Sequence, residues 1–149
     1  MNRFKLAGAA VVVLMAALVA SGQGFKLYPG AAKYTPPDNE ETRQAKKDLP
    51  PGTTSSIYTT NDSYENVVEF YKKVGKEYTM RGMPKSRKLP NGQELKQTFF
   101  IFDGAADLAG SKNWASVQRP FIGSLTWKDG LPEYHDIRDL TAITLAEKE

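Results

Sequence analysis

Residues 57–75, IYTTNDSYENVVEFYKKVG, form the most clearly marked structural element of the chain. A β-like run leads into a segment where Asp62 or Ser63 can cap the start of a helix, and Asp62 with Glu65 has the spacing of a capping box. Gly75 stands where a left-handed glycine commonly follows a helix. These signals predict a short helix directly after a strand.

One side of the predicted helix is apolar at helical period. Its members recur at intervals of three or four residues: Tyr64, Val67, Val68, Tyr71 and Val74. Such a stripe can display aromatic side chains to a ligand or bury them, and amphipathic helices of single domains usually pack on the core. We therefore expect the stripe to lie against a sheet. Phe70 lies off the stripe and is the one aromatic candidate for display.

After the helix, the pattern changes to that of strands. Residues 77–80 are a short candidate, and the Asn-Gly pair in LPNGQ, residues 89–93, predicts a turn into a strand over residues 94–102. The run from Phe99 to Phe102 places large apolar side chains on both faces. This pattern is typical of a central strand that is covered on both sides.

The C-terminal third adds further strands. Residues 113–123 read as a strand in which Pro120 forces an edge or a bulge, residues 128–130 (KDG) as a turn, and residues 139–149 as a strand, with a short helix as the alternative. The predicted fold class is α+β: an antiparallel sheet of about four to six strands with one main amphipathic helix, about 63–75, packed on one face.

A sheet with one helix leaves a second face to be covered. If that face carries Phe99, Ile101 and Trp114, an apolar partner must lie over it, because a large apolar patch in water favours association. The candidates are the FKLYPG segment at residues 25–30, the loop from Trp127 to Tyr134, or a second copy of the chain. Cover within the chain is the first expectation and a homodimer the alternative.

The N-terminus has the pattern of a secretory signal peptide. Arg3 and Lys5 precede an apolar run from Leu6 to Ala20, followed by small and polar residues. This run would give roughly 22 Å of helix, short of the roughly 30 Å hydrocarbon core of a bilayer, so an uncleaved anchor is the weaker alternative. Cleavage is expected after Gly22. Gln23 stands where a lipoprotein signal has its lipid-bearing cysteine, so lipid anchoring is not expected.

The predicted organisation is a signal peptide at residues 1–22 and a single domain at residues 23–149. Residues 35–54, TPPDNEETRQAKKDLPPGTT, read as an exposed loop of this domain, with a helical turn over 38–47 as a variant. The chain has no cysteine, which excludes disulfides, thiol nucleophiles and cysteine-ligated metal centres. Stability must therefore come from packing.

The charge balance gives little support for a polyanionic partner. Removal of Arg3 and Lys5 with the signal lowers the formal net charge from +3 to about +1, so nucleic acid is not expected as a partner. One basic cluster lies around the predicted hairpin, and it reads either as a solvated strand edge or as a patch for an anionic membrane surface. Its members are Lys76, Arg81, Lys85, Arg87, Lys88 and Lys96.

His135 is the only histidine and the main candidate for chemistry. Glu133, Asp136 and Asp139 are close in sequence, so the imidazole could act as a general base or join a mixed metal site. No second histidine supports a metal, and residues adjacent on a strand point to opposite faces. A surface histidine in a polar loop is the favoured interpretation.

Other catalytic and cofactor motifs are missing from the sequence. There is no G-x-S-x-G elbow, P-loop or GxGxxG, and the loop containing Asp103 and Asp107 has Ala105 where a calcium ligand would stand. We therefore predict no catalytic, cofactor-binding or metal residues and no cofactor. The rival hypothesis is an enzyme whose site is assembled from scattered residues, of which four are candidates: Arg119, Tyr134, His135 and Asp136.

The segments LYPGAAKY and IYTTNDSYENVVEFYKKVG resemble a group of small exported bacterial proteins of uncharacterised function. Proteins of this group carry a Tyr-Pro-Gly-Ala element, then a strand, an Asp-Ser helix cap and a Val-Val-x-Phe-Tyr-Lys helix. The resemblance covers residues 27–75 and implies export, with no catalytic residues to carry over.

These observations favour a periplasmic or secreted module that is not an enzyme and that binds an unknown envelope protein or a small ligand. The alternative is a hydrolase-like enzyme with its site around His135 and the neighbouring carboxylates.

Overall fold

The computed structural model describes residues 24–149, and the predicted signal peptide at residues 1–22 lies outside this range. The described chain forms two helices, α2 (Glu40–Lys47) and α3 (Tyr64–Lys72). Its nine strands are β1 (Ala32–Tyr34), β2 (Thr53–Thr60), β3 (Lys76–Tyr78), β4 (Ser86–Lys88), β5 (Glu94–Ile101), β6 (Asn113–Arg119), β7 (Phe121–Lys128), β8 (Leu131–Arg138) and β9 (Thr141–Lys148).

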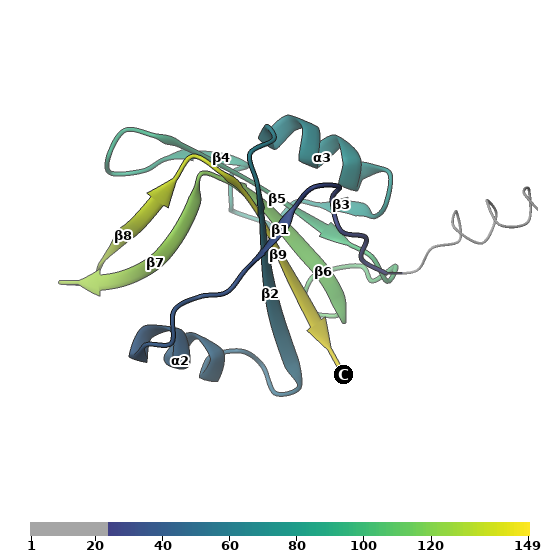
Figure 1. Cartoon of the computed structure of the whole chain (residues 1–149). Helices are drawn as coiled ribbons and strands as arrows, with labels where there is room; N and C mark the ends of the chain where they lie inside the picture. The colour runs from purple at the N-terminus through teal and green to yellow at the C-terminus, as the bar shows by residue number, and fades with distance from the viewer. Residues whose placement is uncertain (1–23) are drawn as a thin grey trace, which may run out of the picture.

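Seven strands form one antiparallel sheet in the order β1-β2-β9-β6-β5-β3, with β4 also paired to β5. β5 is interior, since β6 pairs along one of its edges and β3 and β4 share the other. All four residues from Phe99 to Phe102 are buried, which confirms the predicted central strand. α3 lies on one side of the sheet, whereas α2 and the β7–β8 hairpin lie on the other (Figure 1).

The predicted fold class is wrong. We expected about four to six strands and one main amphipathic helix over 63–75. The chain is instead mostly β, with a seven-stranded antiparallel sheet, a separate β7–β8 pair and two short helices. The strands over residues 121–138 were not expected as such: residues 121–123 of β7 were predicted only as the end of a strand over 113–123, and β8 occupies a stretch that reads as a polar loop.

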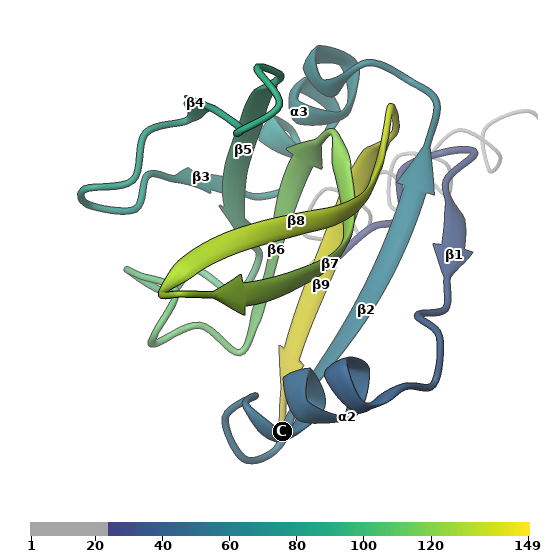
Figure 2. The ribbon, with the colours of Figure 1, turned by 90° about the vertical axis from the view of Figure 1, so that its left-hand side faces the viewer.

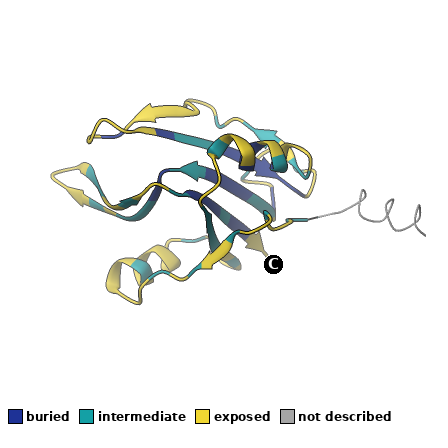
Figure 3. Cartoon of the chain, turned by 45° about the horizontal axis from the view of Figure 1, so that its top comes forward, coloured by how far each residue is buried: buried dark blue, intermediate teal, exposed yellow. Residues whose placement is uncertain are grey.

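α3 packs on the sheet through Val67, Val68 and Tyr71, which are buried together with residues of β5, β6 and β9. Figure 3 shows this core in dark blue beneath the helix. The helix begins after Ser63, whose side chain accepts a hydrogen bond from the backbone N–H of Asn66 at 3.1 Å. Ser63, rather than Asp62, is therefore the cap.

The segment before β1 completes this core. Phe25 stacks on Tyr71 with ring centroids 5.8 Å apart, and Tyr28 packs edge-on against Phe70 at 5.3 Å. Phe70, the one aromatic candidate for display, is thus part of the packing. The FKLYPG segment, one of the candidates to cover the second face, lies instead on the helix side of the sheet.

Gly75 is required for close packing and not for a left-handed turn, because its φ is not positive. A Cβ at this position would lie 2.6 Å from the ring of Phe102 and 2.9 Å from the carbonyl oxygen of Ile101. Gly75→Ala should lower the free energy of unfolding by about 1–3 kcal/mol, measured by urea denaturation, because backbone on one side and a buried ring on the other leave no room. Lys73→Ala, at an exposed position two residues earlier, is a useful comparison. Equal stability of the wild type and Gly75→Ala would contradict this packing.

The second face of the sheet is covered within the chain at Phe99 and Ile101, both of which are buried. Trp114 packs against Phe99 with ring centroids 6.1 Å apart and lines an apolar groove of about 410 Å³. Met80 and Leu108 come from the loops that border this groove. Burial of Phe99 and Ile101 therefore requires no second copy.

The segment from Trp127 to Tyr134 does not cover the sheet either. β6 continues into β7 and β8 into β9, so the β6–β9 pairing extends past Pro120 as a two-stranded ribbon that leaves the sheet. We call β7, β8 and their turn, residues 121–138, the arm. Figures 1 and 2 show it projecting away from the sheet on the side opposite α3. Within the arm only Phe121 is buried.

Candidate functional site

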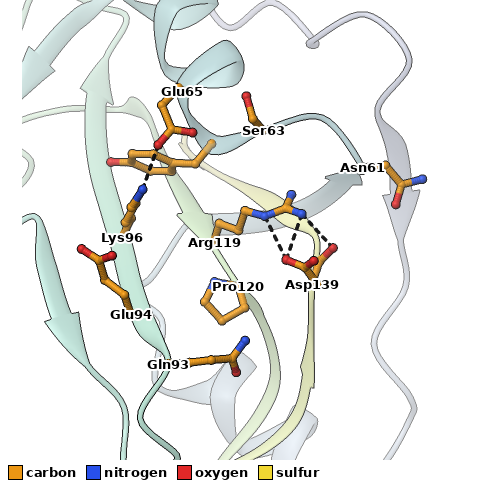
Figure 4. A pocket seen from close by; sticks show the side chains of 10 residues that line it. Asn61, Ser63, Glu65, Gln93, Glu94, Lys96, Arg119, Pro120 and Asp139 are labelled. Atoms are coloured by element: carbon orange, nitrogen blue, oxygen red, sulfur yellow. Dashed lines mark hydrogen bonds and ion pairs between the residues drawn. The ribbon is translucent and has the colours of Figure 1, made fainter.

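A polar pocket of about 390 Å³ lies between the start of α3 and the base of the arm. Figure 4 shows Arg119 at its centre, with the guanidinium turned toward Asp139. Nε and Nη2 of Arg119 pair with Asp139, and Nη2 also donates to the Asp139 carbonyl at 3.1 Å. Nη1 donates to the Asp62 carbonyl at 3.0 Å and to Thr141 Oγ1 at 2.9 Å.

These contacts engage all five N–H donors of the guanidinium, which therefore has none left for a ligand. Thr141 is fully buried and donates from its hydroxyl to the Asp62 carbonyl at 2.7 Å. Arg119 thus ties the bend between β6 and β7 to the loop that starts α3. We call this network of Arg119, Asp139, Thr141 and the Asp62 carbonyl the Arg119 joint, and we interpret it as structural.

The second cation of the pocket is also paired. Lys96 Nζ lies 2.8 Å from Glu65 Oε1 (Figure 4) and above the ring of Tyr64, whose hydroxyl is hydrogen-bonded to Thr98. The hydrogen bond from Lys96 lowers the pKa of the Glu65 carboxyl. This contact replaces the capping box predicted for Asp62 and Glu65. The charges of the polar pocket are satisfied from within the chain.

The four residues of the enzyme hypothesis do not form one site. Arg119 lies in the polar pocket, and Asp136 lies on the other side of the arm, in an ion pair with Arg138 at 2.9 Å. Tyr134 and His135 line a third space of about 310 Å³ beside Pro90 and Asn91. Their dispersal over three spaces favours the binding hypothesis over the enzyme.

His135 also lacks the geometry of a catalytic triad. Its Nε2 lies 2.7 Å from Thr126 Oγ1 and 3.7 Å from Glu133 Oε2. In a triad the hydroxyl and the carboxylate contact opposite nitrogens of the ring, so that one receives the proton while the other orients the imidazole. Here both approach the same nitrogen. His135 is half exposed on the arm, which is a strand and not the polar loop expected.

The basic cluster lies along the outer edge of β5. Lys85 is paired with Glu77, and Lys96 with Glu65. Arg87 on β4 is exposed. Two of the six cations are therefore engaged by carboxylates, as expected of a solvated sheet edge.

A further open space adjoins the arm. Two cavities of about 530 and 620 Å³ lie between β7 and α2, and they share the side chains of Asn39, Glu41, Ala45 and Leu125. We call this continuous space the arm groove. Tyr34 lies at its inner end, where its ring packs edge-on against Phe121 at 4.8 Å and Arg138 lies 5.9 Å from its centroid.

Both walls of the arm groove bury little of their own surface. α2 has no buried residue, although Asn39 caps it by accepting from the N–H of Thr42 at 2.9 Å. Trp127 and Leu131, near the arm tip, are each 69% exposed, and Leu125 is 45% exposed. An isolated two-stranded ribbon and an eight-residue helix are each marginally stable in water. An occupant of the groove would stabilise both.

The turn of the arm has a local sequence signal. Lys-Asp-Gly at residues 128–130 predicts a turn, and Asp-Gly is a strong hairpin signal when strands flank it. The exposed Trp127 and Leu131 stand on either side of that turn. No local sequence pattern indicates the structural role of Arg119, because its contacts join segments that are far apart in sequence.

No protein-family model, curated protein or solved structure matches this chain. Across residues 24–149, no three histidine, aspartate or glutamate side chains gather into a group able to hold a metal ion. Neither α2 nor α3, the helices of that range, has the length and hydrophobicity that crossing a bilayer requires.

Proposed function

We propose that this protein is an exported, non-enzymatic binding module of the bacterial envelope that holds its partner along the arm groove. The observation that carries this proposal is that two weakly buried elements, the arm and α2, face each other across an open space. Binding would cover the exposed Trp127 and Leu131, and indole rings are common anchors at protein interfaces.

Export is part of the same proposal. It is supported by the sequence pattern of residues 1–22 and by the resemblance of residues 27–75 to small exported bacterial proteins. A domain that acts outside the cytoplasm without disulfides must be stable by packing alone. The aromatic core around Tyr71 provides such packing.

Site-specific photocrosslinking tests the arm as the binding surface. A benzophenone amino acid in place of Trp127, in the full-length chain expressed in the source bacterium, should give a covalent adduct on irradiation. Lys73, which directly follows α3 on the side of the sheet opposite the arm, is exposed and provides the matched control. A chain that gives no adduct from position 127, or the same adducts from positions 127 and 73, would contradict the proposal.

A further inference from the structure

The two outer edges of the arm can be distinguished from the geometry of its turn. Asp129 and Gly130 have φ of 52° and 78°, as in the two central residues of a type I′ turn. The strand register places Lys128 opposite Leu131. In a two-residue hairpin this flanking pair is hydrogen-bonded, and pairs then alternate along an antiparallel ribbon. The next pair, Trp127 with Pro132, therefore points its backbone groups outward.

By this alternation the outward backbone groups of β7 belong to Gly123, Leu125 and Trp127. On β8 the outward positions include Pro132, which has no N–H, and Asp136, whose φ of 53° interrupts an extended edge. Both features discourage pairing with a further strand. β7 has neither feature, and no other backbone group of residues 24–149 pairs with its outer edge. The arm has one protected edge and one open edge.

The arm groove runs along the open edge. Every residue from Ile122 to Trp127 lines one of its two cavities, although neighbouring side chains of a strand point to opposite faces. A space bordered by consecutive residues lies beside the edge of a strand. Asp136 of β8 reaches the same space only across Gly123, where its side chain occupies the place that a Cβ of Gly123 would take. α2 forms the opposite wall, and in Figure 1 β7 lies between β8 and α2. An extended chain in this space would lie next to the unpaired N–H and C=O groups of β7.

The wall formed by α2 is acidic. Glu40, Glu41 and Asp48 line the arm groove, and all three are exposed. The basic residues of the helix are not among the lining residues of either cavity: Arg43, Lys46 and Lys47. An occupant of this space would therefore meet negative charge on one side and the backbone edge of β7 on the other. Lysine or arginine side chains directed at α2 would be favoured.

We propose that the partner is an extended, basic polypeptide segment that adds as a strand to the outer edge of β7. Main-chain hydrogen bonds to Gly123, Leu125 and Trp127 would supply affinity, and basic side chains facing α2 would supply specificity. This inference rests on the proposed function and identifies the class of partner. It also accounts for the arm, which as a two-stranded ribbon would become three-stranded on binding.

Amide hydrogen exchange, followed by NMR, tests strand addition directly. The probe is an acetylated and amidated octapeptide of alternating lysine and valine, added to the mature chain. We expect exchange of the Gly123, Leu125 and Trp127 amides to slow at least tenfold. The amides of Ser124 and Thr126, which already bond across to β8, should change much less. An octapeptide of alternating glutamate and valine should have no effect, because α2 repels it.

Matched variants distinguish peptide binding through the backbone of β7 from binding through its side chains. Leu125→Pro removes one outward N–H without removing a β7–β8 hydrogen bond, and should abolish binding of the lysine–valine peptide. Leu125→Ala, which keeps the N–H, should retain most of it. Tyr134→Pro makes the equivalent change on β8, opposite Leu125, and should leave binding unchanged.

The charge of the wall is tested in the same way. Glu41→Lys combined with Asp48→Lys should weaken peptide binding at least tenfold, whereas Arg43→Glu with Lys47→Glu should not weaken it. Failure of the lysine–valine peptide to bind, or protection along β8 instead of β7, would overturn strand addition. Binding of anionic lipid vesicles through the arm, with the β7 amides unprotected, would also overturn it. In each of these cases, adducts from position 127 would still support the proposed function. Conversely, binding of the peptide without any adduct would contradict the proposed function and leave strand addition standing.

Discussion

Replacing Tyr71 with alanine is expected to lower the free energy of unfolding by about 3–5 kcal/mol, the range for truncation of a large buried aromatic side chain. Tyr71 is fully buried at the centre of the core. Four aromatic rings lie with their centroids 5.0 to 5.9 Å from its own: Phe25, Phe70, Phe100 and Phe102. Removal of the ring leaves a cavity where α3, the N-terminal segment and the sheet meet. Urea denaturation measures the effect.

A second substitution isolates the hydroxyl of Tyr71, which accepts a hydrogen bond from the backbone N–H of Tyr28 at 3.1 Å. Burial raises the pKa of this hydroxyl, so it stays neutral at physiological pH. Tyr71→Phe leaves the Tyr28 N–H without its acceptor and should cost about 1 kcal/mol. Leu125→Ala on the exposed arm serves as the control. If Tyr71→Ala were no less stable than Leu125→Ala, the core described here would be wrong.

Arg119→Ala should destabilise the protein by about 2–4 kcal/mol, because it removes all contacts of the guanidinium at once and leaves the hydroxyl of the fully buried Thr141 without its charged donor. The Asp62 carbonyl and the hydroxyl of Thr141 both lose a charged partner. The joint also holds the bend from which the arm leaves the sheet. Limited proteolysis should therefore cut the arm, residues 121–138, sooner in Arg119→Ala than in the wild type.

Arg87→Ala is the matched control for this prediction, since Arg87 is an exposed arginine on β4. It should change stability by less than about 0.5 kcal/mol, as is usual for surface substitutions. Arg119→Lys should fall between the two, because an ammonium group can replace only some of the guanidinium contacts. Unchanged stability and unchanged proteolysis of Arg119→Ala would show that the joint does not hold the arm.

The parts of the fold that sequence patterns predicted are those that bury one clear face. The stripe on α3 is apolar at helical period, and Val67, Val68 and Tyr71 are buried. β5 follows an Asn-Gly turn, and its observed bounds differ by one residue from the range predicted. In both elements, burial requires apolar side chains at fixed intervals, and those intervals are visible in the sequence.

The elements that sequence patterns missed bury little. α2 has no buried residue and so has no apolar stripe, and residues 38–47 were predicted only as a helical turn, a variant of the exposed loop. β8 alternates between two largely solvated faces, and a strand with no core face shows no hydrophobic alternation. These missed elements form the walls of the arm groove and its surroundings. The residues of the candidate site are exposed, so they show no hydrophobic periodicity from which the site could be predicted.

Of the polar residues singled out from the sequence, only Asp136 lines the arm groove, where it is paired with Arg138. His135 drew attention as the only histidine, yet its ring bonds to Thr126 on the neighbouring strand. The loop from Trp127 to Tyr134 was one of three candidates for covering the second face of the sheet, and a tryptophan is usually buried at least in part. The exposure of Trp127 depends on where the arm leaves the sheet, and that is fixed by the contacts of Arg119. Such long-range contacts cannot be read from local sequence.

The central claim is that the arm stands free in the isolated protein and is covered by a partner. Acrylamide quenching of tryptophan fluorescence tests it, in a Trp114→Phe background where Trp127 is the only tryptophan left. We expect acrylamide to quench Trp127 in the purified chain about as strongly as free tryptophan, and much less strongly after the lysine–valine octapeptide is added. A Trp127 that is already shielded in the purified monomer would contradict the central claim.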